Sequence, residues 1–327
     1  MGYRSDAVEF DIDPGSRSKG VLEVGPYFSH NRAKIRSFVS IPYTVVRGTK
    51  DGPTLCITAG VHGTEYVGIA AAIRLSNAIK PDGLKGKLAI IPVVNIPAFV
   101  ERAYMCPIDG VNIQGSWPGR ADSSIAHMIA HRVFSEFISK ADYYLDLHGA
   151  DSHESEIAFA HFQRIGNGDI DLKSEGMARA LGLEYITVSK GETGKGYSYR
   201  EGPEHGKPTA LCELGQGDRL LLEEVSTVFD GLANVMKYLK MLDGPARTTE
   251  NQKILSTRKV GVKHGGLFHS AAKPGTILSK GDIIGEVKNL DGEVIETVHA
   301  PTKGIILLMI HNPLVEPGEK LMTWGEL

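Results

Sequence analysis

Strand-like and helix-like runs of apolar residues alternate along most of the chain. Strand patterns lie at residues 20–50 (two segments, the clearer at 38–46), 54–58, 88–94, 143–147 and 209–212, and helical patterns at 65–79, 123–139 and 219–242. Residues 88–94 have no polar face, so we expect helices to cover both sides of that strand. Residues 96–120 lack strong periodicity and predict a long loop. The alternation is typical of α/β proteins, and we predict a mostly parallel or mixed central sheet covered by helices.

The pattern of apolar and polar residues changes near residue 243. Residues 243–253 are polar and aperiodic, which predicts a linker. Beyond them, Gly and Pro divide short β-like runs and no helical period remains, so residues 254–327 are predicted to form a small all-β domain. We therefore expect an α/β domain over residues 1–242, followed by this linker and the β domain.

Composition narrows the class of protein. Of the 327 residues, 42% are hydrophobic and 23% are charged, which is ordinary for a globular protein. The net charge of −3 gives no basic surface for nucleic acid and no polybasic patch for a membrane. Three cysteines fit buried thiols in a reducing compartment better than a disulfide framework. Residues 1–6 lack the apolar core of a signal peptide, so we expect a cytoplasmic protein.

Three of the predicted strands are each followed by side chains that bind metals. His62 and Glu65 follow the first, His148 closes the second, and Glu213 ends the third. In an open α/β sheet the carboxyl ends of neighbouring strands lie side by side, so these side chains are expected to converge. Two histidines and one carboxylate are a frequent ligand set for catalytic zinc. A further glutamate nearby is the general base that a metal-activated water needs, so the pattern predicts metal-assisted hydrolysis.

Each of these motifs is weak when it is taken alone. A histidine and a glutamate three residues apart at a helix start, such as His62 and Glu65, also fit a surface histidine beside a glutamate that favours the helix dipole. A strand that ends in a carboxylate, as at Glu213, is unfavourable unless the carboxylate has a partner or a role. The three strand ends together favour the metal site.

A family resemblance rests on five stretches: Ala59–Glu65, Asn95–Ala98, Asp109–Gly119, Asp146–Gly149 and Cys212–Gly215. In this order they resemble the succinylglutamate desuccinylase/aspartoacylase family, a branch of the zinc carboxypeptidase superfamily, and its members that deacetylate N-acyl diamino acids in particular. The resemblance implies a zinc carboxypeptidase-like fold with one Zn²⁺ per chain, held by His62, Glu65 and His148. It implies Glu213 as the base that activates water, and Arg102 as the arginine that polarises the scissile carbonyl.

The chain departs from the family pattern within the predicted loop. Where the family has an Asn-Arg pair that grips the free carboxylate of the substrate, this chain has Gln114 and Gly115. Glycine cannot replace the two-pronged hydrogen bonding of arginine, which argues against N-succinylglutamate or N-acetylaspartate as the substrate. Gln114 is still able to hydrogen-bond a neutral polar group. Arg200, with Tyr197 in the same segment, is the candidate for a replacement contact; the alternative for Arg200 is a surface loop residue.

The predicted β domain resembles a barrel-sandwich module of the lipoyl/biotinyl type. Residues 298–304 resemble the strand that follows the modified lysine in such modules, but the predicted hairpin tip, Asp291–Glu293, has no attachment lysine. We therefore do not expect a covalent carrier. Packing, oligomerisation and covering of the catalytic pocket are the alternatives for this domain.

These observations predict a zinc-dependent amidohydrolase that cleaves an N-acyl bond of a small metabolite rather than a peptide bond. Two alternatives stay open: a metallocarboxypeptidase, and a non-catalytic binding protein that keeps the zinc fold. The missing carboxylate grip argues against the first, and the presence of Glu213 argues against the second. We expect a small N-acyl substrate and no nucleic-acid or membrane partner, and the sequence leaves homo-oligomerisation open.

Overall fold

A large sheet forms the centre of the molecule. The computed structural model describes residues 8–28, 36–191 and 193–327. Residues 1–6, from which we predicted that there is no signal peptide, lie outside the described residues. The strands of the large sheet are β1 Arg17–Phe28, β2 Arg36–Arg47, β3 Lys50–Ala59, β4 Lys85–Ile91, β5 Tyr143–His148, β7 Phe159–Arg164, β8 Tyr185–Lys190, β9 Thr209–Glu213 and β10 Lys253–Leu255. Their order across the nine-stranded sheet is β1-β2-β4-β3-β5-β9-β7-β8-β10.

Parallel and antiparallel pairs both occur in this sheet. Strands β3, β4, β5 and β9 pair in parallel, as do β7, β8 and β10. Strands β1 and β2 are antiparallel, β2 is antiparallel to β4, and β7 is antiparallel to β9. The sheet is therefore mixed, and the predicted α/β fold with a covered central sheet is confirmed.

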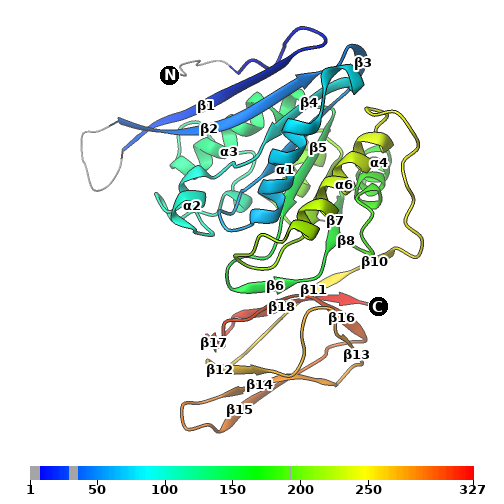
Figure 1. Cartoon of the computed structure of the whole chain (residues 1–327). Helices are drawn as coiled ribbons and strands as arrows, with labels where there is room; N and C mark the ends of the chain where they lie inside the picture. The colour runs from blue at the N-terminus through cyan, green and yellow to red at the C-terminus, as the bar shows by residue number, and fades with distance from the viewer. Residues whose placement is uncertain (1–7, 29–35, 192) are drawn as a thin grey trace.

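Helices pack against both faces of the sheet (Figure 1). They are α1 Tyr66–Ala78, α2 Ile96–Glu101, α3 Ile125–Glu136, α4 Gly168–Ala180, α5 Ser198–Glu204 and α6 Leu222–Tyr238. One buried cluster joins α1, α4 and α6 to the sheet, and a second joins α3 to the opposite face. Successive side chains of β3 point to opposite faces of the sheet, so β3 contributes to both clusters. Leu55 and Ile57 belong to the first cluster, and Cys56 belongs to the second.

Two predicted elements differ from the structure. The predicted loop 96–120 contains the short helix α2, whose start is capped by the Asn95 side chain, which accepts a hydrogen bond from the backbone N–H of Ala98. A helix this short does not display a helical period in the sequence, so the pattern missed it. The strand predicted at 88–94 ends at Ile91, and the residue after it, Pro92, has no N–H to extend the ladder.

The segment after α6 contains strands and no helix. Its strands after β10 are β11 Thr257–Gly261, β12 Gly266–Ser270, β13 Ile277–Leu278, β14 Ile283–Lys288, β15 Val294–His299, β16 Gly304–Ile310, β17 Leu314–Val315 and β18 Lys320–Glu326. They form two antiparallel sheets, β11-β18-β16-β13 and β15-β14-β12-β17. These lie below the large sheet in Figure 1.

The two parts of the molecule are joined by strand pairing and by apolar contacts. The short strand β6, Glu154–Glu156, leaves the α/β part and pairs with β16. A separate buried cluster contains Phe159 and Tyr185 from the large sheet and Ile305 and Leu307 from β16. The β sheets are thus packed beside the carboxyl ends of β5 and β9, where the candidate site lies.

Two further expectations concern the whole chain. Cys56, Cys106 and Cys212 are all buried free thiols, as predicted for Cys56 and Cys212. Among the described residues, no helix has the length and apolar character needed to cross a membrane.

Candidate metal centre and active site

The site is built on the carboxyl ends of three neighbouring parallel strands. Strands β3, β5 and β9 lie next to one another in that order. Their register pairs Ala59 with Leu147 and His148 with Glu213. Paired residues on parallel strands point to the same face, so His148 and Glu213 share one face at the sheet edge. The predicted convergence of strand ends is therefore present.

Tight turns carry His62 and Glu65 from the end of β3 into α1. Gly60 has φ of +61°, a left-handed conformation that favours glycine. Gly63 packs against α2 so closely that a Cβ there would lie 2.2 Å from the carbonyl of Ala98. The loop is thus fixed at both ends, and it delivers two potential ligands to the sheet edge.

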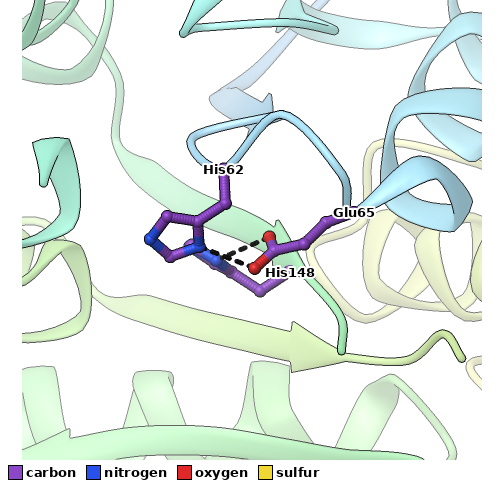
Figure 2. A group of neighbouring side chains, drawn as sticks. All are labelled: His62, Glu65 and His148. Atoms are coloured by element: carbon purple, nitrogen blue, oxygen red, sulfur yellow. Dashed lines mark hydrogen bonds and ion pairs between the residues drawn. The ribbon is translucent and has the colours of Figure 1, made fainter. Parts of the chain in front are cut away.

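Glu65 lies between the two histidines (Figure 2). Its Oε1 lies 2.6 Å from Nδ1 of His62, and its Oε2 lies 2.9 Å from Nδ1 of His148. One potential ligand atom from each residue lies within 4.8 Å of the other two. All three residues are at most 5% exposed. The structure therefore brings together the predicted set His62, Glu65 and His148.

The far sides of both imidazole rings also have partners. Nε2 of His148 lies 3.0 Å from Oδ2 of Asp146, whose Oδ1 accepts a hydrogen bond of 2.6 Å from Thr58. Nε2 of His62 lies 3.1 Å from Oδ1 of Asn112. In the tautomer in which each Nε2 carries the proton, both Nδ1 atoms are acceptors that face the centre of the cluster and can bind a metal ion.

Electrostatics favour positive charge at that centre. Burial acts to raise the pKa of Glu65, but His62 and His148 outweigh it and lower the pKa to about 2. For His148, burial acts to lower the pKa, but Glu65 and Asp146 outweigh it and raise the pKa well above its usual value. The carboxylates that favour a proton on His148 favour a divalent cation in the same place.

The geometry of Glu65 fits a shared metal ion. Its Oε2 is buried and has no hydrogen-bond partner among the described residues, although Nδ1 of His148 lies 2.9 Å away. Atoms that face each other at this distance without hydrogen-bonding geometry fit two ligands aimed at one ion. Two imidazoles and a carboxylate suit Zn²⁺, and other divalent transition metals accept the same donors.

Glu213 stands beside this cluster with an altered proton affinity. Burial, together with the carboxylates of Glu65, Glu154 and Asp146, raises its pKa to about 8, and His148 opposes that shift. A carboxylate whose pKa lies near neutrality is suited to accept and return a proton. Positive charge at the cluster would lower this pKa, because it favours the ionised form.

Arg102 lies at the end of α2 and is exposed. It has φ of +54° and caps the helix through its backbone N–H, which donates to the carbonyl of Ala98. Its neighbour Tyr104 stacks on the ring of His62, with centroids 3.8 Å apart. The segment that carries Arg102 therefore borders the cluster, and the role of its guanidinium stays a prediction.

Gln114 is buried against the cluster rather than open to a ligand. Its Oε1 accepts hydrogen bonds from Nε1 of Trp117 at 3.0 Å and from the backbone N–H of Ser198 at 3.3 Å. Its Nε2 lies 3.0 Å from Nε2 of His148. These contacts tie the 112–117 segment to α5 and favour a positioning role; the predicted substrate contact stays untested.

Arg200 is held by its own segment. Its guanidinium donates to the carbonyls of Gly191 at 2.6 Å and Thr193 at 3.0 Å, and it pairs with Glu204 at 2.5 Å. Tyr197, which precedes α5, is half-buried, and its ring lies 5.3 Å from that of Tyr199. The contacts of Arg200 favour a structural role in shaping the loop, and both residues remain predictions as substrate contacts.

Several residues at the site carry no sequence signal. Asn112 and Tyr104 lie in the aperiodic 96–120 segment, where one asparagine or tyrosine looks like another. Glu156 differs from them, because it closely follows Asp146–Gly149 in the sequence: the pocket wall is one expectation for it and a surface loop the favoured one, and the pairing of β6 with β16 accompanies its burial. Asp146, in contrast, can be placed behind a ligand histidine from the sequence, because alternate residues of a strand share one face.

The chain is similar to known proteins over most of its length. Residues 51–239 match the family described as "Succinylglutamate desuccinylase/Aspartoacylase catalytic domain", and this range contains the whole predicted site. The N-alpha-acetyl-L-2,4-diaminobutyric acid deacetylase of Halomonas elongata is 26% identical over 296 residues, covering 88% of this chain and 86% of that protein.

Two solved structures share the fold over nearly the full chain. The product-bound ectoine utilization protein EutE (DoeB) of Ruegeria pomeroyi has a TM-score of 0.87 at 25% identity, covering 98% of this chain and 97% of that one. A succinylglutamate desuccinylase/aspartoacylase of Rhodobacter sphaeroides has a TM-score of 0.85 at 24% identity, covering 97% and 98%. The chain belongs to the succinylglutamate desuccinylase/aspartoacylase family, whose named members are deacylases of small N-acyl metabolites.

Proposed function

We propose that the protein is a zinc-dependent hydrolase that removes the acyl group from a nitrogen of a small metabolite. The observation that carries this proposal is the buried His62–Glu65–His148 set, with Glu213 in register beside it. A structural role alone does not account for four buried or half-buried titratable groups at one sheet edge. The same arrangement is suited to bind a metal ion and to move a proton next to it.

The roles of the side chains follow from their places. His62, Glu65 and His148 hold the ion, which when bound supplies Lewis-acid chemistry that polarises a carbonyl and makes water more acidic. Glu213 takes the proton of the attacking water and passes it to the leaving amine. Arg102 is proposed to stabilise negative charge on the carbonyl oxygen, a contribution that is typically a few kcal/mol.

We propose an N-acetylated diamino acid or a related N-acyl amine as the substrate. The relative from Halomonas elongata is named for such a substrate. Gly115 also lacks the charge needed to grip a second acidic group. A metallocarboxypeptidase is the less favoured alternative, since it needs a cation for the C-terminal carboxylate.

The test measures release of free amine from a panel of N-acyl compounds. The panel pairs N-acyl aspartate and glutamate with N-acetylated diamino acids and carboxylate-free amides, using metal-free protein with and without added Zn²⁺. Glu213→Gln is expected to bind Zn²⁺ like the wild type and to lose about 10²- to 10⁴-fold in turnover. Glu223→Gln, which removes an exposed carboxylate on α6, is the control.

Each outcome has a distinct meaning. Zinc-dependent turnover of non-acidic members, lost in Glu213→Gln, supports the proposal. Cleavage of peptides with a free C-terminus, assayed beside the panel, would favour the carboxypeptidase. Zinc binding without turnover of any member would leave the binding-protein alternative.

A further inference from the structure

Glu156 is a buried carboxylate that the proposed chemistry does not use. It ends β6 and is 2% exposed. Its backbone pairs with Leu308 of β16, and its carbonyl accepts a hydrogen bond from the side chain of Gln216. Among the described residues, neither oxygen of its carboxylate has a hydrogen-bond partner, although both oxygens are buried. The residue is therefore held firmly while its charged end is left unsatisfied.

The surroundings of this carboxylate are acidic. Burial raises the pKa of Glu156 well above its usual value, and Glu213, Glu65 and Glu154 raise it further. The backbone N–H of Ala150 offsets part of this effect. An ionised carboxylate buried without a partner is strongly unfavourable. A cationic group that arrives with a ligand would remove that penalty.

Lys320 is a cation that the chain itself brings near. It begins β18, is half-buried, and lies within electrostatic range of Glu154, Glu156 and Glu213. It nevertheless forms no hydrogen bond to either oxygen of Glu156 in the described structure. The positive charge of Lys320 thus offsets part of the negative charge of these carboxylates. Both carboxylate oxygens of Glu156 can still accept hydrogen bonds.

We propose that Glu156 binds the free ammonium group of the substrate, and so selects N-acyl diamines and diamino acids over analogues with an uncharged side chain. This inference rests on the proposed function, because it concerns the same pocket. An ammonium group offers N–H donors to an acceptor that has none. Phe159 pairs with Glu213 in the large sheet, and the side chain of Gln216 donates to the carbonyl of Glu156, so Glu156 lies close to the proposed base.

The test compares two substrates that differ in one group. N-acetyl-2,4-diaminobutyrate carries the amine, and N-acetylnorvaline has a methyl group in its place. The ratio of their kcat/KM values is measured for zinc-loaded wild type, Glu156→Gln and the control Glu223→Gln. In Glu156→Gln the ratio is expected to fall about 10- to 100-fold, mainly through a higher KM for the amine. Glu223→Gln is expected to keep the wild-type ratio.

A binding measurement separates this inference from the proposed function. Calorimetric titration of 2,4-diaminobutyrate and of norvaline needs no turnover, so it tests Glu156 even if neither acetylated compound is cleaved. Preference for the diamine in wild type, lost in a Glu156→Gln variant that melts no lower than wild type, supports the inference. An unchanged preference in Glu156→Gln overturns it. Loss of the preference in Lys320→Met with Glu156 intact would also overturn it, because Lys320 would then be the residue that sets selectivity.

Discussion

Asp146 and Glu65 contact opposite sides of the His148 ring. Glu65 faces Nδ1 and Asp146 faces Nε2, so the ring is oriented by two carboxylates at once. A proton on Nε2, directed to Asp146, leaves Nδ1 free to bind a metal ion. The charge of Asp146 also makes the imidazole a stronger donor to that ion.

Asp146→Asn is therefore expected to weaken Zn²⁺ binding about 10- to 100-fold. The amide keeps the shape of the side chain and loses the charge that fixes the ring. Competition with a chromophoric chelator measures the affinity. Asp142→Asn, an exposed position just before the same strand, is the matched control. Equal Zn²⁺ affinity in Asp146→Asn and wild type would show that the charge of Asp146 does not strengthen metal binding by His148.

Glu156 also predicts a pH dependence in the metal-free protein. Burial and neighbouring carboxylates raise its folded-state pKa well above 4.5, so the folded state keeps the proton longer than the unfolded state does. Its contribution to stability is therefore present below pH 4.5 and is lost as the pH rises toward the folded-state pKa. The loss is about 1.4 kcal/mol per pH unit in that window.

Urea unfolding at several pH values measures this effect. The free energy of unfolding of Glu156→Gln is expected to rise relative to wild type as the pH increases above 4.5. Parallel pH profiles for the two proteins would mean that Glu156 is ionised and satisfied in the folded state.

The short 3-10 turn Ile113–Gly115 shows how an element decides which side chains reach the site. Its start is capped by Asn112, whose Oδ1 accepts a hydrogen bond from the N–H of Gln114 and also lies near His62. Gln114 is directed against His148 and α5. The family resemblance predicts an arginine where this chain has Gly115, and a Cβ there would meet nothing within 4 Å.

Gly115→Arg is expected to fold and to lower the KM for N-acyl aspartate or glutamate about 10-fold. The open space admits the side chain, and a guanidinium offers two parallel hydrogen bonds to a carboxylate. Steady-state kinetics on the acidic and non-acidic substrates measure the shift. Gly83→Arg is the control, because its Cβ also meets nothing within 4 Å and it lies on the exposed turn Pro81–Gly83. An unchanged KM in Gly115→Arg would mean that position 115 does not contact the acidic group of the substrate.

Across the whole molecule, the C-terminal sheets complete the α/β part. Strand β16 pairs with β6 next to the site, and its apolar residues share a buried cluster with Phe159 and Tyr185 of the large sheet. Lys320 enters the field of the site from β18. The predicted role of this domain in packing agrees with these contacts, while oligomerisation and pocket closure stay predictions.

A chain that ends at residue 252 is expected to be strongly destabilised. It would lose β10 and leave β6 unpaired, and it would expose Phe159 and Tyr185, whose cluster contains Leu255, Ile305 and Leu307. Each apolar side chain returned to water costs about 1.5–3 kcal/mol. Thermal unfolding and limited proteolysis measure the loss. A truncated chain that melts like the full protein would show that the two parts fold independently.

The sequence by itself determined the mixed sheet with its covering helices, and it identified His62, Glu65, His148 and Glu213 as side chains that converge on one potential metal site. Periodicity reports which residues are buried in an element, and the strand-end rule places such residues side by side. Only the tertiary structure decided that Gln114 is bound against α5 and His148, and that Glu156 and Lys320 lie near Glu213. These placements depend on pairing between distant segments, such as β6 with β16, and no local pattern encodes that pairing.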